Sequence, residues 1–160
     1  KIIRIIKNWG GMKIRFSTRS RYGLRFMIEL ALFYDSKNLV FLREIAEKED
    51  ISEKYLTQLA IPLRARGLIS SRRGAGGGYR LSRPPAQITA KEVIEALEGG
   101  IFPVDCLENP DLCSRVPFCA ARKMWKELQD KISETLEKFT LEDLARMSTD
   151  NPRPPLNYSI

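Results

Sequence analysis

Three cysteines lie close together in the stretch CLENPDLCSRVPFC, residues 106–119, and the chain contains no histidine. Structural zinc takes four ligands, almost always Cys and His, so Cys106, Cys113 and Cys119 cannot complete such a site alone. A single disulfide would leave one thiol over. An iron–sulfur cluster tolerates three thiolates, because a carboxylate, water or small thiol can occupy the remaining iron. The spacing therefore leaves two main alternatives, a metal cluster and free thiols.

The sequence around these cysteines favours a loop that wraps around a small inorganic core. Pro103, Pro110 and Pro117 punctuate residues 101–121, which predicts a non-helical segment. Arg122 and Lys123 follow the last cysteine, and nearby positive charge makes thiols more acidic. Acidic thiols assist metal ligation and oxidation equally, so both alternatives stay open.

Composition predicts one compact domain, or one domain with an arm. The chain has 160 residues, of which 43% are hydrophobic and 29% charged, and no apolar run is long enough to span a membrane. The first residues, KIIRIIKNWGG, lack the long apolar core and cleavage site of a signal peptide. We expect a cytoplasmic protein in which residues 1–11 are an extension outside the fold.

Charge is divided unevenly along the chain. Residues 12–85 carry fifteen Lys and Arg against seven Asp and Glu, whereas residues 86–150 carry eight against thirteen. A basic half joined to an acidic half indicates a polyanion-binding module attached to another kind of segment.

Helical periodicity appears in several segments before and after the cysteines. The spacing of apolar residues predicts four helices, over TRSRYGLRFMIELALFYD, FLREIAEKED, ISEKYLTQLAIPLRARGLI and ITAKEVIEALEGG. The expected caps are Thr18 or Ser20 for the first, Ser52 for the third and Thr89 for the fourth. Gly67 stands at the expected end of the third helix. We expect the third helix to kink or end a segment near Pro62. Two short extended runs, LISSRR and YRLSR, are joined by GAGGG and predict a hairpin.

Residues 12–100 thus have the order of a winged helix-turn-helix, and the predicted fold class is mainly α with a small β-hairpin wing (α+β). A DNA major groove accepts one helix, whose exposed polar groups bond to base edges. Arginines beside a glycine-rich tip suit phosphates or a minor groove, although the tip alone is also typical of an ordinary turn. The predicted contacts with a double-stranded DNA operator are Ser52, Lys54, Tyr55, Thr57, Gln58, Arg72, Arg73, Gly74, Gly76 and Gly77.

A long helix follows the cysteines. ARKMWKELQDKISETLEKF carries an apolar stripe of Trp125, Leu128, Ile132, Leu136 and Phe139, which can serve as a core face or as an interface. TLEDLARM begins with a Thr-x-x-Asp cap and predicts a short final helix. The long and the final helix occupy residues 122–146, and we expect a flexible tail over residues 147–160.

The features in this order resemble the Rrf2 family of winged-helix transcription regulators, from about Met12 to Arg146. The motifs that carry the resemblance are RYGLR, IAEKEDISEKYLTQL, GLISSRRGAGGGYRLSRPPAQIT, VIEALEG, the three cysteines, and CAARKMWKEL with TLEDLA. The resemblance implies a homodimer paired through the long helix, with the stripe residues at the interface. It also implies binding to a two-fold-related DNA site, usually as a repressor.

In cluster-bearing members of the family, cysteines placed like Cys106, Cys113 and Cys119 hold a [2Fe–2S] or [4Fe–4S] centre, and the first is favoured here. The chain departs from that pattern in two places. Arg122 stands where the regulator of cluster assembly has a histidine, and Arg21 where a nitric-oxide-responsive member has an aspartate. The fourth ligand therefore stays open among Asp105, Glu108, Asp111 and a small molecule.

The alternative within the same class is a DNA-binding regulator without a cluster, switched by thiol oxidation or by a protein partner. An iron–sulfur or thiol enzyme is a further alternative from another class. The lack of histidine removes the usual general base and the usual triads, and no grouping of Lys, Asp and Glu replaces them. The sequence therefore predicts a regulator and not an enzyme.

Overall fold

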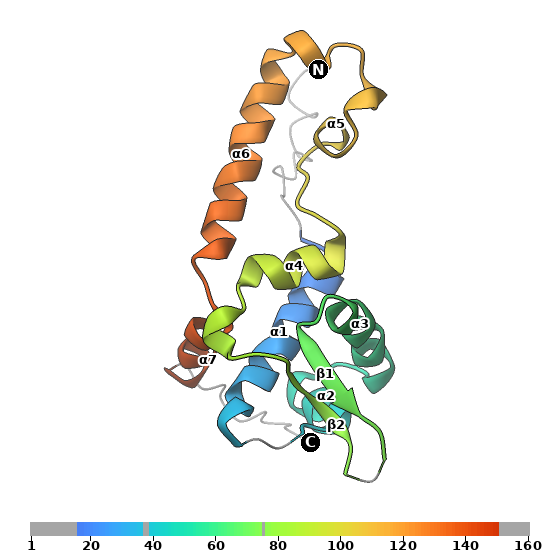
Figure 1. Cartoon of the computed structure of the whole chain (residues 1–160), viewed down its shortest axis with the longest axis vertical. Helices are drawn as coiled ribbons and strands as arrows, with labels where there is room; N and C mark the ends of the chain where they lie inside the picture. Colours follow the sequence, from blue (N-terminus) through green and yellow to red (C-terminus); the bar gives the residue numbers. More distant parts are fainter. Residues whose placement is uncertain (1–15, 37–38, 75, 151–160) are drawn as a thin grey trace, which may run out of the picture.

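The computed structural model describes residues 16–36, 39–74 and 76–150. The predicted extension over residues 1–11 and the part of the predicted tail from residue 151 onward lie outside these residues. The described chain is mainly helical and carries one small antiparallel hairpin (Figure 1). Its elements are α1 (Thr18–Leu32), η2 (Tyr34–Ser36), α2 (Leu42–Glu49), α3 (Glu53–Ala65), β1 (Ile69–Arg72), β2 (Gly78–Leu81), η3 (Pro85–Gln87), α4 (Ala90–Glu98), α5 (Asp105–Glu108), η4 (Pro110–Leu112), η5 (Val116–Phe118), α6 (Ala120–Glu137) and α7 (Leu141–Asp150).

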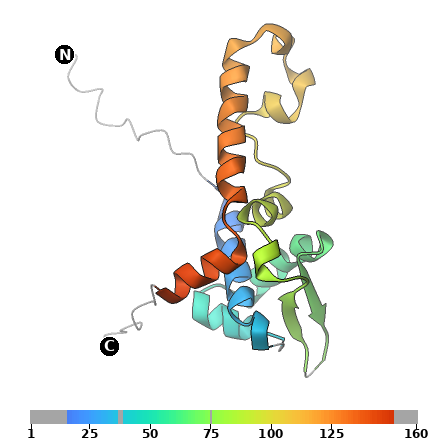
Figure 2. The same cartoon turned by 60° about the vertical axis from the view of Figure 1, so that its left-hand side comes forward.

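The molecule consists of a compact body and an arm. Helices α1–α4, α7 and the hairpin pack together, whereas α6 projects away from them with the cysteine segment at its far end (Figures 1 and 2). The body holds the hydrophobic core, in which Phe26, Leu56 and Leu63 are fully buried. None of the helices within the described ranges is both long and apolar enough to cross a membrane.

Close packing and hydrogen bonds hold α1 against α4. Gly23 lies directly against the side chain of Leu97, and a Cβ at this position would overlap it. At the same end, the hydroxyls of Ser17 and Ser20 donate to the carboxylate of Glu98. Burial acts to raise the pKa of Glu98, but these hydrogen bonds outweigh it and hold the pKa below its usual range. The end of α4, immediately before the arm, is thus fixed to the start of α1.

The chain returns from the arm beside the start of α4. Ala90 N donates to Phe139 O at 2.8 Å and Leu141 N donates to Ile88 O at 2.8 Å, so Thr89 and Thr140 form an isolated antiparallel bridge. Both threonines are also N-caps, and Thr89 forms a complete capping box with Glu92. The starts of α4 and α7 are therefore positioned by the same bridge.

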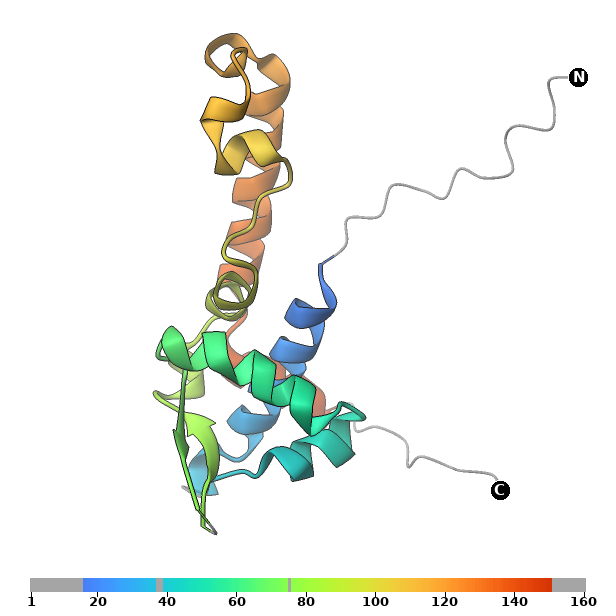
Figure 3. The same cartoon turned by 90° about the vertical axis from the view of Figure 1, so that its right-hand side faces the viewer.

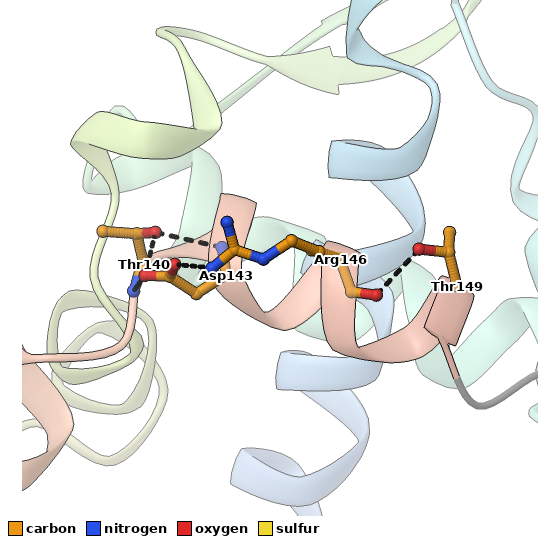
Figure 4. A network of polar contacts seen from close by, with 4 residues as sticks. All are labelled: Thr140, Asp143, Arg146 and Thr149. Carbon is orange, nitrogen blue, oxygen red and sulfur yellow. Dashed lines mark hydrogen bonds and ion pairs between the residues drawn. The ribbon is translucent and has the colours of Figure 1, made fainter.

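Thr140 and Asp143 form the reciprocal cap of α7 (Figure 4). Asp143 N donates to Thr140 Oγ1 at 3.1 Å, and Thr140 N and Oγ1 donate to Asp143 Oδ2 at 3.2 and 2.7 Å. Because an N-cap hydroxyl satisfies an otherwise unpaired backbone N–H, we expect Thr140→Ala to lower the free energy of unfolding by about 1 kcal/mol in a urea titration. Thr149→Ala, which removes an exposed hydroxyl at the end of the same helix, should stay within about 0.5 kcal/mol of the wild type.

The effect of this cap should depend on pH. The hydrogen bonds from Thr140, with the charge of Arg146, hold the pKa of Asp143 below its ordinary value of 3.8. A carboxyl with a lowered pKa stabilises the fold above its unfolded pKa, and this contribution is lost as the pH falls through the folded value. Thr140→Ala should therefore differ most from the wild type at neutral pH. An equal difference at pH 2 would contradict the assignment.

Several local expectations are corrected. The cap of α1 is Ser17 rather than Thr18 or Ser20, since its hydroxyl accepts from Arg19 N and Ser20 N. Helix α3 runs through Pro62 and ends three residues later, near the expected position. The segment expected to be non-helical contains one α-turn and two 3-10 turns. Prolines stand at the first positions of the two 3-10 turns, where they are accepted. Helix α7 runs to Asp150, so the tail does not begin at residue 147.

Candidate nucleic-acid interface and cysteine loop

The turn between α2 and α3 is fixed by backbone geometry. Asp50 adopts a left-handed conformation with φ 53°, which a short polar side chain tolerates. Ile51 N then donates to Ala46 O at 3.1 Å, and the Ile51 side chain is buried. Ser52 caps α3 by accepting from Tyr55 N at 3.2 Å, as predicted. The angle between the two helices is set within three residues.

Two ion pairs tie α2 to α1. Arg25 bonds to the carboxylate of the buried Glu49 and also donates to its carbonyl oxygen at 2.6 Å. Lys48 Nζ lies 2.7 Å from the carboxylate of the buried Glu29. Burial raises the pKa of Glu29, and the Lys48 ammonium only partly offsets this effect. Such partly buried pairs fix the orientation of α2, and therefore of α3, on the body.

Helix α3 presents a polar face to solvent. Lys54, Thr57 and Gln58 are exposed, whereas the opposite face, with Leu56, Leu59 and Leu63, is buried in the core. Figure 3 shows α3 running across the side of the molecule, with the hairpin beside its end. The structure thus brings these three predicted contacts together on one accessible surface.

Tyr55 is placed differently from the other predicted contacts on this helix. Its ring is half-buried and meets Tyr22 of α1 edge-on, with centroids 6.0 Å apart. Arg25 lies over the same Tyr22 ring, with its guanidinium carbon 5.3 Å from the centroid. The aromatic body of Tyr55 therefore helps to fix α3 on α1.

The hairpin of β1 and β2 forms a wing that carries exposed arginines. Its register pairs Ser70 with Arg80 and Arg72 with Gly78, and Val40 adds a third short pairing, bonded to Tyr79 through N–O distances of 2.9 and 2.8 Å. This pairing was not predicted, because a single residue gives no strand pattern. Arg72 and Arg73 are exposed and form no ion pair within the described residues.

The glycines of the wing divide into two kinds. Gly74 and Gly76 are exposed, and a Cβ would meet nothing within 4 Å at either. Gly77 is buried, and its Cβ would lie 2.8 Å from Gly74 O and closer still to Arg72 O. Gly77 is enclosed by the turn itself, and a DNA contact at this residue stays a prediction. Among the described glycines of the wing tip, Gly74 and Gly76 are the ones that have open space around the backbone.

The cysteine segment supplies three free thiols from separate turns. Cys106 lies in α5 and is half-buried, Cys113 follows η4 and is exposed, and Cys119 is the half-buried N-cap of α6. Within the described residues, no group of three Cys, Asp or Glu side chains is arranged to hold a metal ion. Asp105, Glu108 and Asp111 are exposed on the same turns. Three thiols suit a cluster chemically, but their present arrangement does not form its site.

Arg122 contacts the cysteine segment through the backbone. Its Nε donates to Cys106 O at 3.2 Å, joining the first turn of α6 to α5. A guanidinium stays protonated in proteins and cannot ligate a metal. Arg122 therefore orders this part of the arm rather than completing a ligand set.

Helix α6 carries its apolar stripe without burying it. None of its residues is buried, and Trp125, Leu128, Ile132 and Leu136 are only half-covered, as is Phe139 just beyond the helix. A hollow lies between the start of α1, the end of α4 and α6, and its lining includes Phe16, Phe102, Trp125, Leu128 and Ile132. Lys91–Glu137 (2.9 Å) and a hydrogen bond from Gln129 to Ile101 O (2.7 Å) attach the helix along its length.

Comparisons with known proteins agree with this architecture. The family model described as "Rrf2: Iron-dependent Transcriptional regulator" matches residues 16–147. The chain is 44% identical to the HTH-type transcriptional regulator CymR of Bacillus subtilis (strain 168) over 132 residues, which cover 82% of this chain and 90% of CymR. It is 37% identical to Protein rrf2 of Nitratidesulfovibrio vulgaris over 146 residues, covering 91% of this chain and 97% of that protein.

Solved structures extend the likeness to three dimensions. CymR of B. subtilis, described as its global cysteine regulator, superimposes with a TM-score of 0.70 at 43% identity, covering 84% of this chain and 98% of CymR. IscR of T. potens superimposes with a TM-score of 0.71 at 33% identity, covering 91% of this chain and 96% of IscR. The predicted fold class is confirmed, and CymR is named as a transcriptional regulator rather than an enzyme. The chain belongs to the Rrf2 family of transcriptional regulators.

Proposed function

We propose that the protein is a homodimeric DNA-binding transcription regulator, acting as a repressor, whose DNA affinity is controlled by an iron–sulfur cluster on Cys106, Cys113 and Cys119. The observation that carries the DNA-binding part is the exposed polar face of α3 beside the exposed arginines of the wing. The tight turn and the two ion pairs to α1 keep that face rigid. Free thiols and a DNA partner also fit a cytoplasmic location.

The proposed complex places α3 in a major groove and the wing against the neighbouring backbone. Lys54, Thr57 and Gln58 then face base edges and nearby phosphates, where side chains of these types make hydrogen bonds. Arg72 and Arg73 supply positive charge for phosphates or a minor groove. Selection of an operator from a random-sequence duplex pool tests this function directly, and failure to enrich any sequence would refute it.

Arg73→Ala should weaken operator binding by roughly tenfold, because each protomer loses one phosphate contact. The slope of log affinity against log salt should fall by about two for a dimer. Fluorescence anisotropy between 50 and 200 mM salt measures both quantities, with and without iron. Lys138→Ala, which removes an exposed charge at the base of the arm, is the matched control and should change neither. Unchanged binding by Arg73→Ala would show that the wing does not contact the operator.

The dimer is inferred from the arm. An 18-residue helix with an apolar stripe and no buried residue is typical of an interface helix, and the hollow beside it offers apolar side chains for a second copy. Ile132→Glu should therefore yield a monomer of 18.3 kDa, because a carboxylate would be buried without a partner. Sedimentation velocity measures the mass. The exposed Glu127→Gln should remain a dimer, and a dimer with Ile132→Glu would move the interface elsewhere.

The cluster is inferred from the donor set. Three thiols lie within one segment at the end of an arm, thiolates are the usual protein ligands of iron–sulfur centres, and the matching family model is described as iron-dependent. Because the thiols do not converge, binding requires the turns between Cys106 and Cys119 to rearrange. When bound, the cluster would supply a redox-sensitive group, with [2Fe–2S] favoured and [4Fe–4S] as the alternative.

A regulator switched by thiol oxidation, without a cluster, is the second candidate. It is favoured by the absence of a preformed metal site among the described residues and by the exposed thiol of Cys113. The similarity to a global cysteine regulator points the same way. Iron and acid-labile sulfide per chain, measured on protein purified without air, distinguish the two candidates. A colourless, iron-free protein after anaerobic reconstitution would support the thiol switch.

A further inference from the structure

Ile61 is an apolar side chain on the polar face of α3. It is 59% exposed, whereas the core-facing residues Leu59 and Leu63 are almost completely buried. Ile61 follows Lys54 by seven residues, Thr57 by four and Gln58 by three, so all four side chains share one helix face. The isoleucine therefore lies within the surface that the proposed function assigns to base edges.

The fold gives no reason for isoleucine at this position. Ile61 does not belong to the hydrophobic core cluster, nor to the half-buried residues that pack against it. A β-branched side chain is also a poorer helix former than the lysine or glutamine found on the same face. The body of the protein would be at least as stable with a polar residue here. We therefore look for the role of this side chain in binding rather than in folding.

We propose that Ile61 contacts the C5-methyl group of a thymine in the operator and thereby helps to determine sequence specificity. This inference rests on the proposed DNA-binding function. Among the edges exposed in a major groove, thymine alone of the four unmodified bases presents a methyl group, and apolar side chains recognise it by direct contact. Lys54, Thr57 and Gln58 provide hydrogen bonds on the same face, whereas Ile61 provides the apolar surface.

The test removes the methyl group without changing base pairing. An operator is first selected by the wild-type protein from random-sequence duplex DNA, and each thymine is then replaced singly by deoxyuridine. We expect one thymine in each half-site to be the contacted one. Replacing that thymine by deoxyuridine should lower the affinity of the wild type about fourfold for each methyl group removed. Ile61→Ala should bind the thymine operator about as weakly as the wild type binds the substituted one, and should not distinguish the two.

Two controls separate this contact from a general effect. Met147→Ala removes an exposed apolar side chain from α7, on the other side of the body, and should keep the full discrimination. Ile61→Val retains a branched apolar surface and should keep most of it. If no sequence is selected, the DNA-binding function itself fails. If an operator is selected but Ile61→Ala still loses affinity at every deoxyuridine as the wild type does, only the assignment of Ile61 is overturned.

Discussion

Replacing Cys113 with alanine is expected to leave a chain that folds and binds DNA but holds no iron. Cys113 is exposed and lies in a turn outside the core, so the free energy of unfolding should change by no more than about 0.5 kcal/mol. The replacement removes one of three thiolates, and the segment contains no histidine to take its place. Iron and acid-labile sulfide after anaerobic purification, with a visible spectrum, measure the result.

Ser114→Ala is the matched control for this experiment. Ser114 is the exposed neighbour of Cys113, and its replacement should leave the iron content at the wild-type value. A full complement of iron and sulfide in Cys113→Ala would show that this thiol is not a ligand. Wild-type protein without iron would instead leave the three thiols to redox chemistry, and the DNA-binding surface would be unaffected.

Gly78→Ala should destabilise the wing by about 2–5 kcal/mol and abolish operator binding. Gly78 has φ 137°, a conformation that side chains rarely adopt, and a Cβ would lie only 2.7 Å from Val40 O. Because that carbonyl accepts from Tyr79 N at 2.8 Å, the clash would break the pairing that joins the wing to the segment before α2. Urea denaturation and an operator titration measure the two effects.

Gly76→Ala is the matched change in the same hairpin. A Cβ at Gly76 meets nothing within 4 Å, so its stability should remain within about 0.5 kcal/mol of the wild type. Any loss of DNA affinity in this variant would then reflect contact at the tip and not unfolding. Equal stability of Gly76→Ala and Gly78→Ala would contradict the steric account of the wing.

Local rules predicted much of the fold. Ser52, Thr89 and Thr140 were recognisable as helix caps because each precedes an apolar period and can bond to a backbone N–H within the first turn. The hairpin followed from two extended runs around a glycine-rich turn. Ser17 was missed as the cap of α1 because several hydroxyl residues stand together there, and only the backbone decides among them.

Features that depend on distant residues could not be read from the sequence. The single-residue pairing of Val40 with Tyr79 has no local pattern, and the enclosure of Gly77 depends on the carbonyls of the opposite side of the turn. Ile61 is exposed beside the buried stripe of α3, and its place on that face follows only from the packed structure. The three cysteines were predicted as a set, but their convergence depends on tertiary structure that spacing does not specify.

The bridge between Thr89 and Thr140 closes the body without using a residue of the cysteine segment or of α6. The chain leaves after Glu98 and returns at Phe139, where backbone hydrogen bonds join it to the start of α4. The arm is thus an insertion between two elements that already meet, and exposed insertions of this kind tolerate changes in length and composition. Changes confined to the cysteine segment can therefore accumulate while the helices and hairpin of the body are retained. Relatives described as a global cysteine regulator and as IscR both align with this chain over most of their length.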